Sequence, residues 1–78
     1  MPRSTPPDHV LARRRRIGDQ IRAARLEQSL TQEAVALRAG IDRASYVRIE
    51  QGHASPLLDS LILIADAIGL PLAHLVRE

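Results

Sequence analysis

Residues 30–52 read LTQEAVALRAGIDRASYVRIEQG, and this stretch contains the signals that begin and end two short helices. Thr31 and Asp42 are residue types whose side chains accept hydrogen bonds from the free N–H groups at a helix start. Gly40 has the conformational freedom that a left-handed helix end requires. The stretch therefore predicts one helix between Thr31 and Gly40, and a second helix after Asp42 that ends at Gly52.

Two helices joined by so short a turn cross steeply, which requires a small residue at the crossing and apolar side chains between them. Ala36 is small enough for the crossing and lies four positions before the turn glycine. The apolar residues expected to lock the two helices together are Val35, Ala39, Ile41, Tyr46 and Ile49. Because these features occur together at this spacing, they predict a helix-turn-helix.

The outer face of the second helix, over residues 43–51, carries a different set of side chains. At about 100° per residue, five of them fall within an arc of roughly 140°. They are Arg43, Ala44, Val47, Arg48 and Gln51. Arginine forks match the edge of guanine, and the small apolar groups can contact the methyl group of thymine. This face is therefore predicted to read base edges in DNA.

Charge is distributed unevenly along the 78 residues, although the net charge is only +2. All eleven basic side chains are arginine, and ten precede position 49, where only five acids are found. A basic half joined to an acidic half favours a polyanionic partner. One run of arginines either reaches DNA phosphates as an arm or only keeps the chain in solution; its members are Arg13, Arg14, Arg15 and Arg16.

Several classes of site and function are disfavoured by the composition. The chain has no cysteine, and its histidines at 9, 53 and 74 lack the spacing of metal ligands, so we predict neither a metal site nor a cofactor. No nucleophile–base pair or pair of carboxylates emerges, so we predict that the protein is not an enzyme. The longest apolar run is too short to cross a membrane, and we see no signal peptide.

Helical periodicity predicts three more helices. The first begins near His9, with Asp8 as its cap, and the others cover 58–68 and 72–78. The side expected to face the core contains Ile17, Ile21, Ala24 and Gln28 in the first helix, and Leu58, Leu61, Ile62, Ala65 and Ile68 in the 58–68 helix.

No segment alternates with a period of two residues, so the predicted fold class is all-α, with five helices. Residues 9–78 are predicted to form one compact domain. Residues 1–8 contain three prolines and almost nothing to bury, and are predicted to be a flexible tail.

With these elements in place, the chain resembles the phage-repressor-like (Xre/Cro-type) helix-turn-helix transcription regulators over about residues 17–76. The resemblance rests on IGDQIRAARLEQSLTQEAVALRAG, IDRASYVRIEQG and SPLLDSLILIADAIGLPLAHL. It implies that Gln32 contacts a DNA phosphate and braces the recognition helix. It also implies a base-facing position for Arg43, Ala44 and Arg48, and a phosphate-facing position for Ser45 and Gln51.

The same resemblance implies a structural salt bridge between Arg25 and Glu50 that ties the first helix to the third. Tyr46 would either find a partner for its hydroxyl or point that hydroxyl toward the DNA backbone. Leu57 and Pro71 stand where a serine or threonine often caps a helix in this family. The helices that follow them are therefore expected to be shifted or weakly capped.

The resulting hypothesis is a sequence-specific regulator of transcription that is located in the cytoplasm and binds double-stranded DNA there. It would act as a homodimer through the 58–68 and 72–78 helices, on an operator that is an approximate palindrome. The alternative is a protein–protein interaction module, an adaptor or antitoxin-like partner on the same scaffold. The sequence leaves open which operator is bound, which genes are regulated, and whether they are repressed or activated.

Overall fold

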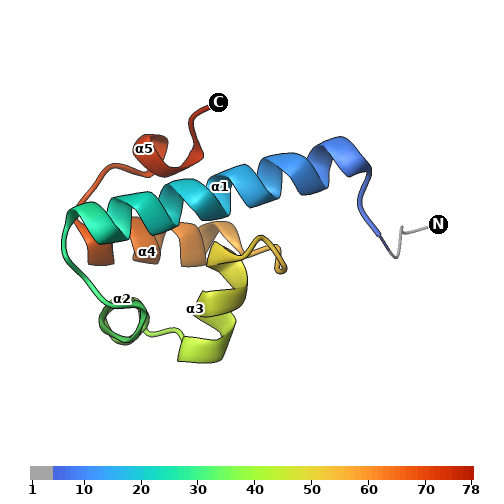
Figure 1. The fold of residues 1–78 in the computed structure, drawn as a ribbon. Coiled ribbons are helices and arrows are strands. Elements are labelled where there is room, and N and C mark those ends of the chain that lie inside the picture. Colours follow the sequence, from blue (N-terminus) through green and yellow to red (C-terminus); the bar gives the residue numbers. More distant parts are fainter. Residues whose placement is uncertain (1–4) are drawn as a thin grey trace.

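The computed structural model describes residues 5–78, which form five α-helices and, within that range, no strand (Figure 1). They are α1 (Asp8–Glu27), α2 (Gln32–Ala39), α3 (Arg43–Glu50), α4 (Leu58–Ile68) and α5 (Leu72–Val76). α1 lies across the molecule, with α2 and α3 on one side of it and α5 on the other (Figure 1). The predicted all-α, five-helix fold is confirmed. None of the helices in residues 5–78 has both the length and the apolar character needed to cross a membrane.

The start of α1 differs from the prediction by one residue. Asp8 is the first helical residue rather than the cap, and the capping position is held by Pro7, whose side chain cannot accept a hydrogen bond. In the first turn, the Asp8 carboxylate still faces the positive end of the helix dipole. The predicted tail, residues 1–8, therefore ends in helix, and its first four residues lie outside the described part of the chain.

The two short helices of the opening motif form as the sequence predicts. Thr31 Oγ1 accepts a hydrogen bond of 3.0 Å from the Ala34 backbone N–H, and Asp42 Oδ2 accepts one of 3.0 Å from the Ser45 backbone N–H. Gly40 ends α2 in the left-handed conformation, with a φ of 71°. Because each end is fixed by local chemistry, the turn places α3 steeply against α2 (Figure 1).

The core lies where α1, α2 and α3 meet α4 and α5. Its buried apolar side chains are Ile21, Ala24, Val35, Ala36, Ala39, Tyr46, Ile49, Ile64, Ala65, Ile68 and Leu75. Ile17 and Leu61 pack against this cluster and are partly buried. Gln28 was predicted to face the core; it is instead exposed, because α1 ends at Glu27 and Gln28 already belongs to the turn.

α4 presents a different side to the core from the one predicted. Ile64 is fully buried, whereas Leu58 and Ile62 are 63% and 42% exposed. The buried stripe has the spacing i, i+3, i+4 and i+7, starting at Leu61, and Ile62 lies about 110° from its centre. Leu58 lies nearer to the stripe but in the first turn, at the end of the bundle. The prediction for these two residues was therefore wrong.

The N-terminal starts of α4 and α5 are as weakly capped as expected. The residues before them, Leu57 and Pro71, make no side-chain capping hydrogen bond. α4 nevertheless begins at Leu58, as predicted, and α5 ends at Val76, two residues earlier than predicted.

α1 lies very close to the end of α3. A Cβ atom on Gly18 would lie 2.5 Å from the backbone oxygen of Glu50 and 2.8 Å from that of Ile49. Both distances are far shorter than real Cβ contacts, so only glycine allows this approach. Gly18, which interrupts a helical pattern in the sequence, is therefore the residue that lets α1 rest on the helix that follows the turn.

Candidate nucleic-acid interface

The outer face of α3 is open to solvent along its length. Arg43, Ala44, Arg48 and Gln51 are exposed, and Val47 is half-buried. The opposite face of the same helix contains the buried Tyr46, Ile49 and Glu50. The structure thus separates the predicted reading face from the core-facing side of α3.

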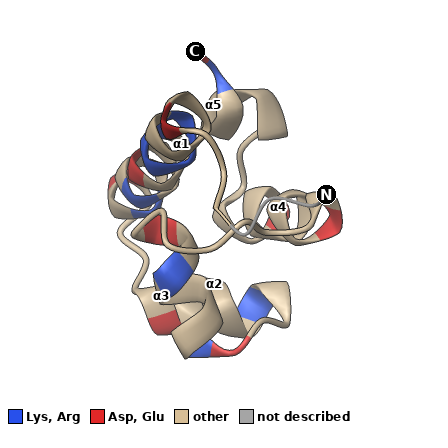
Figure 2. Ribbon diagram, turned by 90° about the vertical axis from the view of Figure 1, so that its right-hand side faces the viewer, with Lys and Arg blue, Asp and Glu red and all other residues tan. Residues whose placement is uncertain are grey.

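Most of the arginines lie in α1, and two lie in α3. The ribbon in Figure 2 is coloured as basic along α1 and on α2 and α3, whereas α4, on the other side of that view, carries acidic residues and no basic one. An excess of basic over acidic residues in α1 and α3 favours the approach of a polyanion, over a distance of roughly 10 Å at ordinary salt concentrations.

The two ends of α3 hold polar side chains in local contacts. Ser45 Oγ donates a hydrogen bond of 2.7 Å to Asp42 Oδ1, and its backbone N–H donates to the other carboxylate oxygen. These two bonds, the backbone one first, hold the pKa of Asp42 below its usual value. The Ser45 hydroxyl proton is therefore already engaged by Asp42. At the other end, Arg48 Nη2 lies 3.4 Å from the His53 backbone oxygen.

Beneath the outer face, Arg25 of α1 and Glu50 of α3 form a buried ion pair. Arg25 Nε donates to Glu50 Oε2 at 2.7 Å, and Nη2 donates to Oε1 at 3.1 Å. The third nitrogen, Nη1, donates to the Leu30 backbone oxygen at 3.0 Å. The guanidinium fork thus fixes α1 against both α3 and the loop before α2.

Two further donors bind the same carboxylate. The Tyr46 hydroxyl donates to Glu50 Oε2, and Gln32 Nε2 donates to Oε1 at 3.2 Å. A carboxylate has about four lone-pair sites, so Glu50 is saturated by donors from three helices. Among residues 5–78, every buried side-chain nitrogen or oxygen has a hydrogen-bond partner. We call Glu50, Arg25, Tyr46 and Gln32 the Glu50 cluster.

The protonation states of the cluster follow from these contacts. Burial by itself would raise the pKa of Glu50, but the hydrogen bonds from Arg25, Tyr46 and Gln32 outweigh it and lower that pKa. The hydrogen bond to Glu50 raises the pKa of Arg25. Burial, and then donation to Glu50, raises the pKa of the Tyr46 hydroxyl. The cluster therefore contains a carboxylate, a guanidinium and a neutral phenol at neutral pH.

The arginine run does not form a single arm. Arg14 Nε donates to the Gly52 backbone oxygen at 2.9 Å, and Arg13 Nε lies 3.0 Å from Glu78 Oε1. Arg15 and Arg16 are exposed. The first two arginines are thus engaged with the chain itself.

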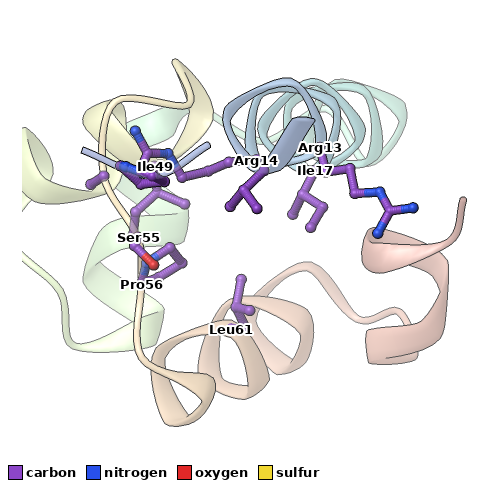
Figure 3. Close-up of a pocket in the computed structure, with 10 residues that line it drawn as sticks. Arg13, Arg14, Ile17, Ile49, Ser55, Pro56 and Leu61 are labelled. Atoms are coloured by element: carbon purple, nitrogen blue, oxygen red, sulfur yellow. The ribbon is translucent and has the colours of Figure 1, made fainter. Parts of the chain in front are cut away.

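An apolar pocket of about 360 Å³ separates the first two arginines of the run (Figure 3). It lies between α1, the loop around Ser55 and Pro56, and α4, from which Leu61 points into it. Arg14 leaves α1 toward α3, while Arg13 extends away from it (Figure 3). Because the core is open here, Ile17 and Leu61 are only partly buried.

Three contacts near the interface were not predicted from the sequence: Gln32 with Glu50, Tyr46 with Glu50, and Arg14 with Gly52. The sequence does indicate the contact between Tyr46 and Glu50, because residues four apart on one helix lie on the same side of it. The other two join positions 18 and 38 residues apart, and no local pattern indicates them.

Comparison with known proteins places this geometry in a family. The model of the helix-turn-helix family matches residues 21–75. The chain is 37% identical, over 59 residues, to the cryptic phage CTXphi transcriptional repressor RstR of Vibrio cholerae, and 34% identical, over 62 residues, to the immunity repressor protein of Bacillus phage phi105. Those stretches cover 76% and 80% of this chain, but only 53% and 43% of the two relatives, so the chain spans about half their length.

A solved structure has a similar fold. The restriction-modification controller protein C.AhdI of Aeromonas hydrophila superposes with a TM-score of 0.80 at 26% identity, covering 82% of this chain and 97% of that one. The matched family model covers both helices of the motif and the Glu50 cluster. The chain therefore belongs to the helix-turn-helix family, and its resemblance to the phage-repressor-like (Xre/Cro-type) regulators is confirmed.

Proposed function

We propose that residues 9–78 are the DNA-binding domain of a regulator of transcription, which recognises a specific sequence in double-stranded DNA through α3. The observation that carries this proposal is the outer face of α3. Arg43 and Arg48 are exposed there, on a helix whose other side is fixed to α1 and α2 by the Glu50 cluster. A rigid helix with exposed arginine forks suits readout in the major groove.

The roles proposed for individual side chains follow from their positions. Arg43, Ala44, Val47 and Arg48 would face base edges. Gln32, which bonds to the last residue of α3, and Gln51, which directly follows α3, would contact phosphates and set the register of α3 on the duplex. Ser45 would contact a phosphate only by releasing Asp42, because its hydroxyl proton is engaged there. We therefore assign it a smaller share of the affinity than Gln51.

We further propose that two copies bind together through α4 and α5. Four large apolar side chains around α4 are exposed: Leu57, Leu58, Ile62 and Leu63. Such a group on a small domain is characteristic of a contact surface. Two α3 helices would then enter half-sites about 34–36 Å apart, and the operator would be an approximate palindrome. A regulator of this kind would act in the cytoplasm, beside the chromosome.

The relatives support the proposal through what their names state. One is a transcriptional repressor, another is an immunity repressor, and C.AhdI is a controller protein. The two repressors are roughly twice as long as this chain, and C.AhdI is 26% identical to it. The DNA target of this chain is therefore measured directly in the following test.

The test is selection from a pool of random DNA duplexes, read by sequencing. Wild-type protein is expected to enrich one palindromic sequence. The Arg43→Ala/Arg48→Ala variant is expected to lose that enrichment, since each arginine contributes about 1–3 kcal/mol of discrimination. Arg77→Ala is the matched control, because it removes an exposed arginine beyond α5, away from α3.

The outcomes separate the two candidate functions. Enrichment that the double variant loses and the control keeps supports readout by α3. Equal enrichment by wild type and double variant would mean that these arginines do not specify the sequence. No enrichment by folded wild-type protein at low salt would favour the protein–protein interaction module.

A further inference from the structure

Glu50 Oε2 accepts two hydrogen bonds, one from Arg25 and one from the Tyr46 hydroxyl; Oε1 accepts one from Arg25 and one from Gln32. The carboxylate is thus held on both oxygens, and its hydrogen bonds join α1, α2 and α3. Tyr46 is fully buried, and it is the donor to Glu50 that comes from α3 itself.

The Gln32 amide is oriented by this carboxylate. Its Nε2 carries two hydrogens, and the one that donates to Glu50 Oε1 fixes the direction of the other. Gln32 is the first residue of α2 and is only half-buried, so part of the residue is open to solvent and to a bound duplex. An amide fixed in this way can donate to a phosphate without losing side-chain freedom on binding.

We infer that the Tyr46 hydroxyl is a positioning group for DNA recognition, which acts through Glu50 on Gln32. This inference rests on the proposed function. Phenylalanine fills the same space without donating, so Tyr46→Phe leaves one lone pair of a buried carboxylate unsatisfied. The carboxylate then turns to regain a donor, and Gln32 loses the fixed direction of its second N–H.

The consequence differs between specific and non-specific binding. Specific binding requires base contacts and phosphate contacts to be made together, so it depends on the positions of α3 and Gln32. Non-specific binding depends mainly on the number of positive charges near the duplex, and Tyr46→Phe does not change that number. The hydroxyl should therefore control the ratio of the two affinities.

The experiment measures the dissociation constants of wild type and Tyr46→Phe, for the sequence obtained by selection and for an unrelated duplex. We expect about a tenfold loss of affinity for the selected sequence and no change for the unrelated one. Ile68→Val is the matched control, since it removes one buried methylene from α4, a helix that contributes no member to the Glu50 cluster. At a temperature where all variants are folded, its specificity ratio should equal that of wild type.

A double-mutant cycle with Gln32→Ala tests the route of the effect. If Tyr46 acts through Gln32, the loss caused by Tyr46→Phe should fall below about threefold in the Gln32→Ala background. The side-chain amide signals of Gln32, measured by NMR in the free protein, should also shift in Tyr46→Phe and stay in place in Ile68→Val. This measurement requires no DNA.

Three results would overturn the inference: an unchanged specificity ratio in Tyr46→Phe, the same loss in Ile68→Val, or losses that simply add in the cycle. If wild-type protein shows no preferred sequence, the proposed function fails first, and the inference fails with it. If wild type prefers a sequence and Tyr46→Phe keeps that preference in full, only the inference is wrong.

Discussion

Glu50 carries its charge inside a contact between helices, and this makes stability depend on pH. Its folded-state pKa lies below the ordinary value of 4.5, so the folded protein binds its proton less readily than the unfolded chain does. The stabilisation is therefore complete above about pH 5 and is lost as the pH falls through the folded-state value. We expect the free energy of unfolding, measured with urea, to decrease as the pH falls from 5 to 3.

The carboxyl resonance of Glu50 provides a direct check, because Asp42 also has a lowered pKa and contributes to the same slope. In a ¹³C NMR titration, the midpoint for Glu50 should lie below 4.5. A midpoint above that value would show that burial outweighs the hydrogen bonds to Glu50, and Glu50 would then not be the source of the stability lost in acid.

At the scale of helices, the contact between α1 and α3 depends on the absence of one side chain. Gly18→Ala gains about 0.5–1 kcal/mol of helix propensity, but it places a methyl group against two backbone oxygens of α3 that cannot move independently. Overpacking of this kind costs about 1–3 kcal/mol or more. We therefore expect Gly18→Ala to lower the free energy of unfolding by about 2 kcal/mol, as measured by urea denaturation.

Asp19→Ala is the matched control for this prediction, since Asp19 is the exposed neighbour on the same turn of α1. It gains helix propensity without meeting another helix, and should leave stability unchanged or slightly higher. If Gly18→Ala proved as stable as Asp19→Ala, the close approach of α1 to α3 would be wrong.

The helices also show which features a sequence can predict. Thr31, Gly40 and Asp42 act on their own neighbours, so the bounds of α2 and the start of α3 follow from local chemistry. α4 is apolar on almost every side, so periodicity does not determine which side is buried. The choice of Ile64 over Ile62 is made by packing against other helices, above all α2, which lies more than twenty residues earlier in the chain.

The same distinction holds for the candidate interface. The outer face of α3 could be predicted, because a helix separates its two sides by a fixed angle per residue. The family resemblance implied that Gln32 braces α3, but its partner there, Glu50, could not be predicted, because this requires the relative placement of α2 and α3 to be known to within a hydrogen-bond length.

For the whole molecule, the remaining question is how much of its positive charge meets DNA. The described chain measures 40 × 25 × 18 Å, and Arg15 and Arg16 project from the long helix that spans it. Each phosphate contact makes log K fall with log salt concentration by about 0.9. We expect Arg15→Gln/Arg16→Gln to weaken binding to all sequences alike and to reduce the salt slope by about 1 for each arginine that touches a phosphate.

Arg38→Gln/Arg77→Gln is the control, because it removes the same number of positive charges from positions outside the arginine run of α1 and outside α3. Its slope should stay close to that of wild type. Equal slopes in all three proteins would mean that the run only keeps the chain in solution, and a loss confined to the selected sequence would make these arginines part of the specific readout.

The bond from Arg14 to the Gly52 carbonyl has a consequence for local unfolding. It joins the early turns of α1 to the second residue after α3, and Arg13 adds an exposed link to Glu78. Terminal turns of a helix usually open on their own, at almost no cost in free energy. Here, fraying of α1 as far as Arg14 would remove the donor to the Gly52 carbonyl, so we expect the opening of the two segments to be coupled. The start of the first helix thereby helps to keep the end of the third in place.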